Sequence, residues 1–269
     1  MYLLIDIGNT RIKIGLARQG CATREATTLA YAHHEIHHLQ TWLHNQAGIL
    51  TGAYGVCVAD TAVREQVEQY LDELTIRATW LTGADPFPLL LNGYEHPHLL
   101  GADRWLSAIG LLHQADTHAH SFVHASFGTA TTVDSILFNE NQQHHDFEGG
   151  VILPGPQLMG QALALNTAQL NVGTSNVDIF PKHTQSAIST GITAAQVGAV
   201  MRQWLFTYEH SPSVPWLFGS GGASAMVREE LEHAFAQQIS QLSVPEAHLI
   251  WCDTPTLDGL ASMAYYHHP

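Results

Sequence analysis

The chain is poor in positive charge. Its 269 residues include 10 Lys and Arg against 24 Asp and Glu, which gives a formal net charge of −14. A broad surface for the phosphates of DNA or RNA needs many basic side chains. The composition therefore argues against a nucleic-acid partner, and we expect any anion site to be local.

Cysteine and uninterrupted apolar runs are also scarce. The three cysteines show neither CxxC nor zinc-finger spacing, which excludes a disulfide framework and a zinc finger. Asp6 and Arg11 interrupt the apolar start of the chain, so it lacks a signal-peptide core. The uncharged stretch 149–177 is broken by prolines and asparagines, unlike a membrane span. We expect a cytoplasmic protein without a membrane partner.

The chain also lacks a functional P-loop. Residues 155–162 have the spacing of a Walker A motif, but Gln161 stands where the motif needs lysine and Ala162 where it needs a hydroxyl residue. This excludes a P-loop enzyme.

Histidine, by contrast, is abundant, with 19 copies. The run HHEIHH at 33–38 places histidines at the i, i+4 spacing that can bind a metal on a helix. Because no carboxylate or thiolate motif accompanies the run, we interpret it as a solvated helix face and predict no structural metal there.

Hydrophobic periodicity predicts an α/β fold, with strands and helices alternating in the first half and the pattern restarting near residue 121. We predict strands at 2–7, 11–17, 53–60, 78–83, 121–125, 129–138 and 247–253, and helices at 62–74, 105–115 and 184–210. Residues 139–150 are interpreted as a connection, 151–170 as a short strand running into a helix, and 214–239 as strand, glycine loop and helix. The length suits two domains, 1–117 and 118–269.

Two glycine turns, 120 residues apart, join apolar strands in MYLLIDIGNTRIKIGLA and HASFGTATTVDSIL. Glycine turns let backbone N–H groups approach the phosphates of a nucleotide. In the first turn Asn9 and Thr10 add side-chain donors, Lys13 adds a cation, and Asp6 is a suitable Mg²⁺ ligand. The turn at 128–132 and the glycine loop at 219–222 are further candidates for nucleotide contact. Taken alone, either turn is also compatible with an ordinary hairpin.

These elements resemble the acetate and sugar kinase, Hsc70 and actin superfamily. The order DIGNT, GADRW (101–105), GTATTVD (128–134), GGVILPGPQLMGQAL (149–163), SGG and TLDGLA (256–261) is similar to that of type III pantothenate kinases, a family that includes the Bvg accessory factors. The resemblance spans nearly the whole chain. It implies duplicated actin-like (ribonuclease H-like) domains, each with a mixed central sheet flanked by helices.

The resemblance implies a homodimeric enzyme that uses ATP and Mg²⁺ to phosphorylate the primary hydroxyl of pantothenate to 4′-phosphopantothenate, the first step of coenzyme A biosynthesis. The expected ATP and Mg²⁺ residues are Asp6, Ile7, Gly8, Asn9, Thr10, Arg11, Ile12, Lys13 and Thr129, with the two turns facing one another across a cleft. The expected pantothenate residues are Tyr94, Gly101, Ala102, Asp103, Arg104 and Thr184, with Asp103 as the catalytic base.

Elementary chemistry supports two of these roles. Phosphoryl transfer depends on positioning and charge neutralisation, and a carboxylate such as Asp103 can orient a hydroxyl by accepting its proton. The fork of Arg104 suits the single carboxylate of pantothenate. The alternative is that Asp103 caps the N-terminus of a helix and Arg104 is a surface charge.

The chain departs from the family at two positions. Ser126 stands where the family usually has an aspartate that binds a monovalent cation, K⁺ or NH₄⁺, and Ala223 stands where it often has an acidic residue. A serine hydroxyl provides oxygen but no charge, so the ion binds weakly, its requirement is lost, or the chain is a regulatory protein without turnover. A kinase of the same superfamily for another small hydroxyl substrate is the remaining alternative.

Overall fold

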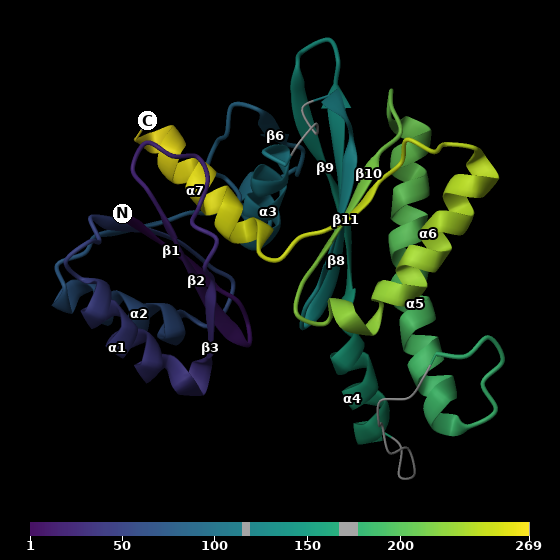
Figure 1. Ribbon diagram of the computed structural model, residues 1–269, viewed down its shortest axis with the longest axis horizontal. Helices are drawn as coiled ribbons and strands as arrows, with labels where there is room; N and C mark the ends of the chain where they lie inside the picture. The colour runs from purple at the N-terminus through teal and green to yellow at the C-terminus, as the bar shows by residue number, and fades with distance from the viewer. Residues whose placement is uncertain (115–118, 167–176, 269) are drawn as a thin grey trace. The chain divides into compact units, whose positions relative to one another are not determined.

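The computed structural model describes residues 1–114, 119–166 and 177–268 (Figure 1). The chain divides into two compact units. Unit 1 consists of Met1–His118 with Thr254–Pro269, and unit 2 consists of Ala119–Asp253. The fold class of mixed sheets flanked by helices is confirmed.

The assignment of all of 118–269 to the second domain is wrong at its C-terminal end. Helix α7 (Pro255–His267) belongs to unit 1, where it packs against α3 (Ala102–Leu112) and β1 (Tyr2–Ile7). The physical reason is its apolar surface, since Leu257, Leu260 and Met263 are fully buried there. The predicted boundary at 117/118 lies outside the described residues.

The sheet of unit 1 has the strand order β3-β2-β1-β4-β5. Strand β2 (Arg11–Ala17) is antiparallel to β1 and to β3 (Leu29–Ala32), whereas β4 (Gly52–Cys57) is parallel to β1 and to β5 (Ala78–Trp80). The predicted strands 2–7 and 11–17 are confirmed to the residue, because their apolar runs end at the turn on both sides.

Helices cover both faces of this sheet, and they decide which way each β1 side chain points. Leu3, Ile5 and Ile7 pack in one core with buried residues of α1 (Ile36–Gln46) and α2 (Thr61–Glu73), and Figure 1 shows these two helices together on one side of the strands. Side chains alternate along a strand. Asp6 therefore points to the opposite face, which α3 and α7 cover.

Two glycines let α3 and α7 cross closely. A Cβ atom on Gly110 would run into the Pro255 carbonyl, and one on Gly259 would run into the Leu106 carbonyl. Because these obstacles are backbone atoms, a side chain at either position would push the helices apart. The crossing holds α3 against α7 within unit 1, and with α3 it holds the GADRW segment at the N-terminus of that helix.

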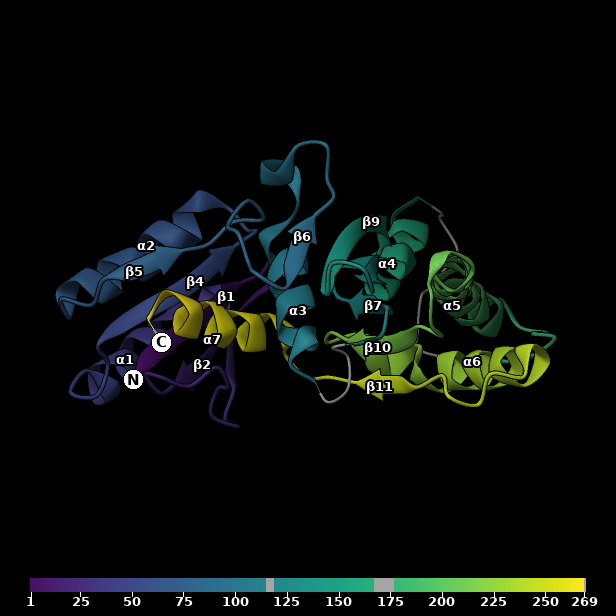
Figure 2. The same ribbon diagram turned by 90° about the horizontal axis from the view of Figure 1, so that it is seen from above.

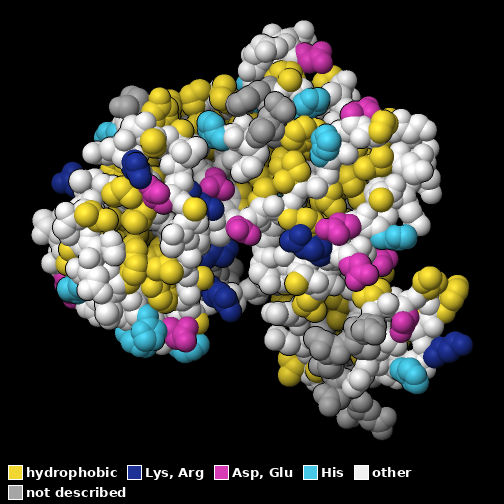
Figure 3. Space-filling view, viewed as in Figure 1, with side chains coloured by type: hydrophobic (Ala, Val, Ile, Leu, Met, Phe, Trp, Pro, Cys, Tyr) yellow, Lys and Arg dark blue, Asp and Glu magenta, His cyan; other side chains and the backbone are white. Residues whose placement is uncertain are grey.

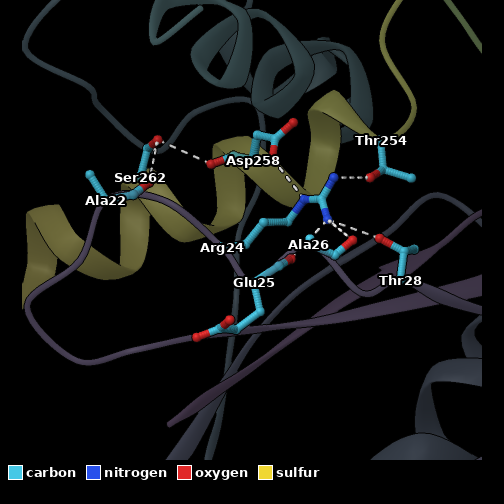
Figure 4. Close-up of polar contacts among 8 residues, drawn as sticks. All are labelled: Ala22, Arg24, Glu25, Ala26, Thr28, Thr254, Asp258 and Ser262. Atoms are coloured by element: carbon cyan, nitrogen blue, oxygen red, sulfur yellow. Dashed lines mark hydrogen bonds and ion pairs between the residues drawn. The ribbon is translucent and has the colours of Figure 1, made fainter.

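Arg24 ties the start of α7 to the connection between β2 and β3 (Figure 4). Its Nε lies 2.7 Å from Asp258 Oδ1, and its two terminal nitrogens lie 2.7 Å from Thr254 Oγ1 and 2.9 Å from Thr28 Oγ1. The arginine side chain is only 12% exposed. It therefore fixes the point at which the chain re-enters unit 1.

We predict that Arg24→Ala lowers the free energy of unfolding by about 2 to 4 kcal/mol, because removing one partner of a largely buried ion pair leaves the other uncompensated. Arg18→Ala is the matched control. Arg18 pairs with Glu25 at 2.7 Å, but its side chain is 71% exposed, so its loss should cost at most about 1 kcal/mol. Urea denaturation of both variants tests this, and equal losses would contradict it.

Within unit 2 the strand order is β11-β10-β7-β8-β9. The strands are β7 (Phe122–Phe127), β8 (Ala130–Asn139), β9 (His144–Pro154), β10 (Trp216–Ser220) and β11 (Leu249–Trp251). Strand β7 is antiparallel to β8 and parallel to β10. Residues 139–150, expected as a connection, lie largely in β9. Their alternation, with His145 and Phe147 buried, is concealed by neighbouring polar residues.

The helices of unit 2 are α4 (Pro156–Asn166), α5 (Thr184–His210) and α6 (Arg228–Leu242). Figure 2 shows α5 and α6 close together, and Val123, Ala125 and Phe127 of β7 share a core with their buried residues. The predicted helix 184–210 is confirmed to the residue. The 151–170 strand and helix are confirmed as far as Asn166, and residues beyond it lie outside the described part.

The short elements complete the fold. They are the 3₁₀ turns η1 (His33–Glu35), η2 (Pro97–Leu99) and η4 (Ser224–Met226), with strand β6 (Leu90–Asn92). Among the described helices, none combines the length and apolar character that a membrane span requires. Histidine side chains lie in several separate places on the face drawn in Figure 3.

Candidate functional site

The first glycine turn lies beyond the last β1–β2 pair, Ile7 with Ile12, and spans four residues from Gly8 to Arg11, the first residue of β2. The Gly8 N–H donates to the Arg11 carbonyl at 3.0 Å. A Cβ atom on Gly8 would meet only that carbonyl oxygen, at an ordinary 3.5 Å. The chain itself therefore tolerates a side chain here, and glycine keeps the outside of the turn open. Asn9, Thr10 and Arg11 are exposed, whereas Ile7 and Ile12 are buried core residues that support the turn.

Asp6 and Lys13 lie opposite one another on β1 and β2, with Nζ 3.7 Å from Oδ2. Asp6 is 6% exposed. Burial raises its pKa to about 6, although the Lys13 charge lowers it, and the negative charge of Asp103 raises it further. The two carboxylates therefore interact electrostatically within unit 1.

Asp103 lies in the first turn of α3, behind the N-cap Gly101. Its Oδ1 accepts the Arg104 backbone N–H at 2.8 Å. Burial raises the pKa of Asp103, against the lowering effect of that hydrogen bond and of the Arg104 charge. A Cβ atom on Gly101 would lie 2.9 Å from Oδ1, so glycine leaves room for the carboxylate. Ala102 follows as the first residue of the helix and is half-buried.

Arg104 is 6% exposed, so its expected alternative as a surface charge is wrong. The N-cap alternative for Asp103 is also wrong, because Gly101 takes that position. The Arg104 guanidinium donates to the Tyr94 hydroxyl at 2.7 Å and lies 5.6 Å from the centroid of its ring. The structure thus brings Tyr94 and Arg104 together beside Asp103.

The second turn, in unit 2, is one residue shorter than the first. Phe127 pairs with Thr131, which leaves Gly128 to Ala130 in the turn, and Gly128 N–H donates to the Ala130 carbonyl at 3.0 Å. Thr129 is exposed at its tip. Ser126 is half-buried at the end of β7, opposite Ser220 and Thr132 in register.

Two further glycines lie in close contact with the backbone of this second turn. A Cβ atom on Gly155 would run into the Gly128 carbonyl, and one on Gly221 would run into the Phe127 carbonyl. Gly221 also has φ +97°, a conformation that favours glycine. Gly155 was missed by the sequence analysis because it belongs to the failed Walker-like motif, and its Pro-Gly-Pro setting was the available signal.

Thr184, the last of the predicted pantothenate residues, is the first residue of α5 and is exposed. It belongs to unit 2 with Ser126 and Thr129, whereas Asp6, Lys13, Tyr94, Asp103 and Arg104 belong to unit 1.

His33 is a residue that the sequence analysis misjudged. Its ring Nε2 lies 2.9 Å from the Gly8 carbonyl oxygen, and the side chain is half-buried. His34, His37 and His38 are exposed, as the prediction of a solvated face requires. The i, i+4 spacing gave no hint of the His33 contact, because this residue lies in η1, before α1 begins.

The residues of unit 1 fit a Mg²⁺ ion that arrives with a nucleotide. In the described part of the chain, no group of three or more His, Cys, Asp or Glu is arranged to hold a metal. Mg²⁺ usually binds one or two carboxylates together with substrate phosphates and water. The buried carboxylate of Asp6, next to an open glycine turn, matches that arrangement.

Comparison with solved structures shows which known folds the chain resembles. A protein from Campylobacter jejuni described as a Baf family transcriptional activator aligns with a TM-score of 0.57 and 17% identity, covering 98% of each chain. A Listeria monocytogenes protein described as an N-acetylmannosamine kinase aligns with a TM-score of 0.55 and 10% identity, covering 100% of this chain and 99% of that one. The chain therefore shares its overall fold with these two proteins.

Sequence comparison defines the family. The family model described as type III pantothenate kinase matches residues 2–205. A type III pantothenate kinase of Bordetella petrii is 39% identical over 100% of this chain and 99% of its own length. One from Bordetella pertussis is 38% identical, covering 98% and 97%. The chain belongs to the type III pantothenate kinase family.

The raised pKa of Asp6 predicts a cost to folding at neutral pH. Because the folded carboxyl keeps its proton up to about pH 6, the native state binds more protons than the unfolded chain between about pH 4 and 6, so stability falls as the pH rises through this window. At pH 7.5 the ionised group should cost on the order of 2 to 3 kcal/mol. We predict that Asp6→Asn is more stable than the wild type at pH 7.5.

This advantage of Asp6→Asn should shrink toward pH 5. Urea denaturation at the two pH values, without nucleotide or divalent ions, measures it. Asp72→Asn, which removes an exposed carboxylate of α2, is the control. A wild type that is more stable than Asp6→Asn at pH 7.5 would contradict the prediction.

Proposed function

We propose that the chain transfers the γ-phosphoryl group of ATP to the primary hydroxyl of pantothenate, giving 4′-phosphopantothenate and ADP. Family membership supports this reaction. The observation that carries the residue assignment is the Asp103 carboxylate at the N-terminus of α3, next to the hydrogen-bonded pair of Arg104 and Tyr94 and close enough to Asp6 for the two charges to interact.

In this mechanism Asp103 is the catalytic base. It accepts the proton of the pantothenate hydroxyl, whose oxygen forms a bond to the γ-phosphorus while the bond from that phosphorus to the β,γ-bridging oxygen breaks. Burial supports this role, because it raises the pKa of Asp103 and so makes its ionised form a stronger base.

The pantothenate carboxylate is assigned to Arg104, whose fork can bind two oxygens. Tyr94 holds the guanidinium from one side, at 2.7 Å. Gly101 and Ala102 shape the same helix start, and Thr184 is the contribution proposed from unit 2. The buried position of Arg104 strengthens its attraction for a carboxylate that enters the site.

The phosphates are assigned to the first turn, where Gly8, Asn9, Thr10 and Arg11 present backbone and side-chain donors. Lys13 offsets negative charge beside Asp6, which would hold Mg²⁺. When bound, Mg²⁺ neutralises the developing charge on the transferred group. Thr129 of the second turn is proposed as a further ATP contact.

Ser126 is proposed as a monovalent cation position with a weakened ion requirement. A half-buried hydroxyl can donate one oxygen ligand to K⁺ or NH₄⁺, but it adds no negative charge. We further propose that the enzyme works in the cytoplasm as a homodimer.

We predict that purified protein releases ADP from Mg–ATP only when pantothenate is present. Asp103→Asn should lower kcat by about 10²- to 10⁴-fold, the usual effect of losing a general base. The isosteric change leaves the N-cap Gly101 in place. Exchange of K⁺ for Na⁺ should alter the rate little if Ser126 has relaxed the ion requirement.

The control for this assay is Asp72→Asn, which should keep the wild-type rate. Turnover with another small alcohol but not with pantothenate would contradict the proposal that pantothenate is the substrate. Full activity of Asp103→Asn would contradict the role of Asp103 as catalytic base. If folded protein shows no turnover in either buffer, the proposal that the chain is an active kinase is wrong.

A further inference from the structure

We propose that His33 is a positioning residue that orients the first glycine turn for the nucleotide phosphates. This inference rests on the proposed nucleotide role of that turn. The ring Nε2 of His33 lies 2.9 Å from the Gly8 carbonyl oxygen. Since the carbonyl can only accept, His33 Nε2 carries the hydrogen of this bond.

Strand pairing brings His33 to this place. Ala32 at the end of β3 lies opposite Arg11, the last residue of the turn, so the next residue along the chain is beside the turn. Glu35 accepts the Ala32 backbone N–H at 3.3 Å, and Ile36 anchors the start of α1 in the core at 6% exposure. The backbone on both sides of His33 is thus held in place, which fixes the position of the imidazole.

The hydrogen bond fixes the direction of one peptide group. In a trans peptide the C=O and the following N–H point in opposite directions, and the described chain has no cis peptide bonds. When His33 captures the Gly8 carbonyl, the Asn9 N–H must point away from the imidazole. Asn9 is an exposed residue of the turn, and its N–H is the donor that we assign to a phosphate.

This geometry matters because Gly8 does not fix the peptide by itself. Glycine has more backbone freedom than any other residue. The neighbours of Gly8 would also accept a Cβ atom, so close packing does not fix its backbone. An external hydrogen bond therefore removes freedom that a phosphate ligand would otherwise have to remove on binding. The consequence falls on nucleotide affinity and not on pantothenate.

The test compares His33→Gln with His33→Met, two side chains of similar size of which only glutamine has an N–H donor. We expect His33→Met to raise the dissociation constant for Mg–ADP and the KM for ATP by about 5- to 10-fold, the value of one lost hydrogen bond. His33→Gln should recover most of this loss, and the KM for pantothenate should stay unchanged in both. Calorimetric titration with Mg–ADP and steady-state kinetics provide these values.

His34→Met is the matched control, because His34 lies on the same 3₁₀ turn but is exposed. It should bind Mg–ADP like the wild type. Equal binding by His33→Met and the wild type would overturn the role of His33 alone, as would equal losses in the Gln and Met variants. A parallel rise in the KM for pantothenate would assign His33 a general structural role instead. A wild type that fails to bind Mg–ADP would overturn the nucleotide role of the turn, and this inference with it.

Discussion

The electrostatic interaction of two carboxylates in unit 1 is the constraint on which the candidate site depends. Asp6 reaches the α3 side of the sheet because β1 alternates, and Asp103 reaches it because Gly101 begins α3 there. Burial raises the pKa of both carboxyls; Lys13 opposes the shift at Asp6, and Arg104 and Lys13 oppose it at Asp103. Two buried carboxylates with raised pKa values attract a cation or a proton. In the proposed mechanism Asp6 takes the cation and Asp103 takes the proton of the hydroxyl.

The packing around this pair explains features of unit 1 that seem unrelated to it. The close crossing at Gly110 and Gly259 holds α3 against α7, and Arg24 fixes the start of α7. The C-terminal helix, which its buried apolar surface holds in unit 1, thus supports the helix that carries Asp103. Burial of the Asp6 charge lowers the free energy of unfolding, and the packing of the surrounding core offsets this cost.

Glycines serve two different purposes in the turns. Gly155 and Gly221 allow close backbone contact in unit 2, where a Cβ atom would collide with the second turn. A Cβ atom on Gly8 would collide with nothing and would make one ordinary contact, 3.5 Å from the Arg11 carbonyl oxygen. The sequence presented both kinds as similar glycine motifs. Only the atoms around each position separate a glycine needed for packing from one that leaves room for a ligand.

Much of the fold was readable from the sequence because its signals are local. The apolar runs of β1 and β2 and the small-residue helix α5 are confirmed to the residue. The first part of β9, residues 144–150, was missed because histidines and acids occupy its alternating positions, and α7 was misassigned because its partners lie far away in the sequence. Within the site, the motif order led to Asp6, Asp103 and Arg104. The His33 contact arises from strand register, which a histidine run does not reveal.

The most direct test is to measure the pKa of the Asp6 carboxyl group by ¹³C NMR titration of metal-free protein, following the resonance of its carboxyl carbon, which is assigned by its absence in Asp6→Asn. We expect a pKa of about 6 for this group in the wild type and a lower value in Asp103→Asn, where the neighbouring charge is gone but burial persists. A carboxyl that titrates near 4, its ordinary range, and does so equally in both proteins would contradict it.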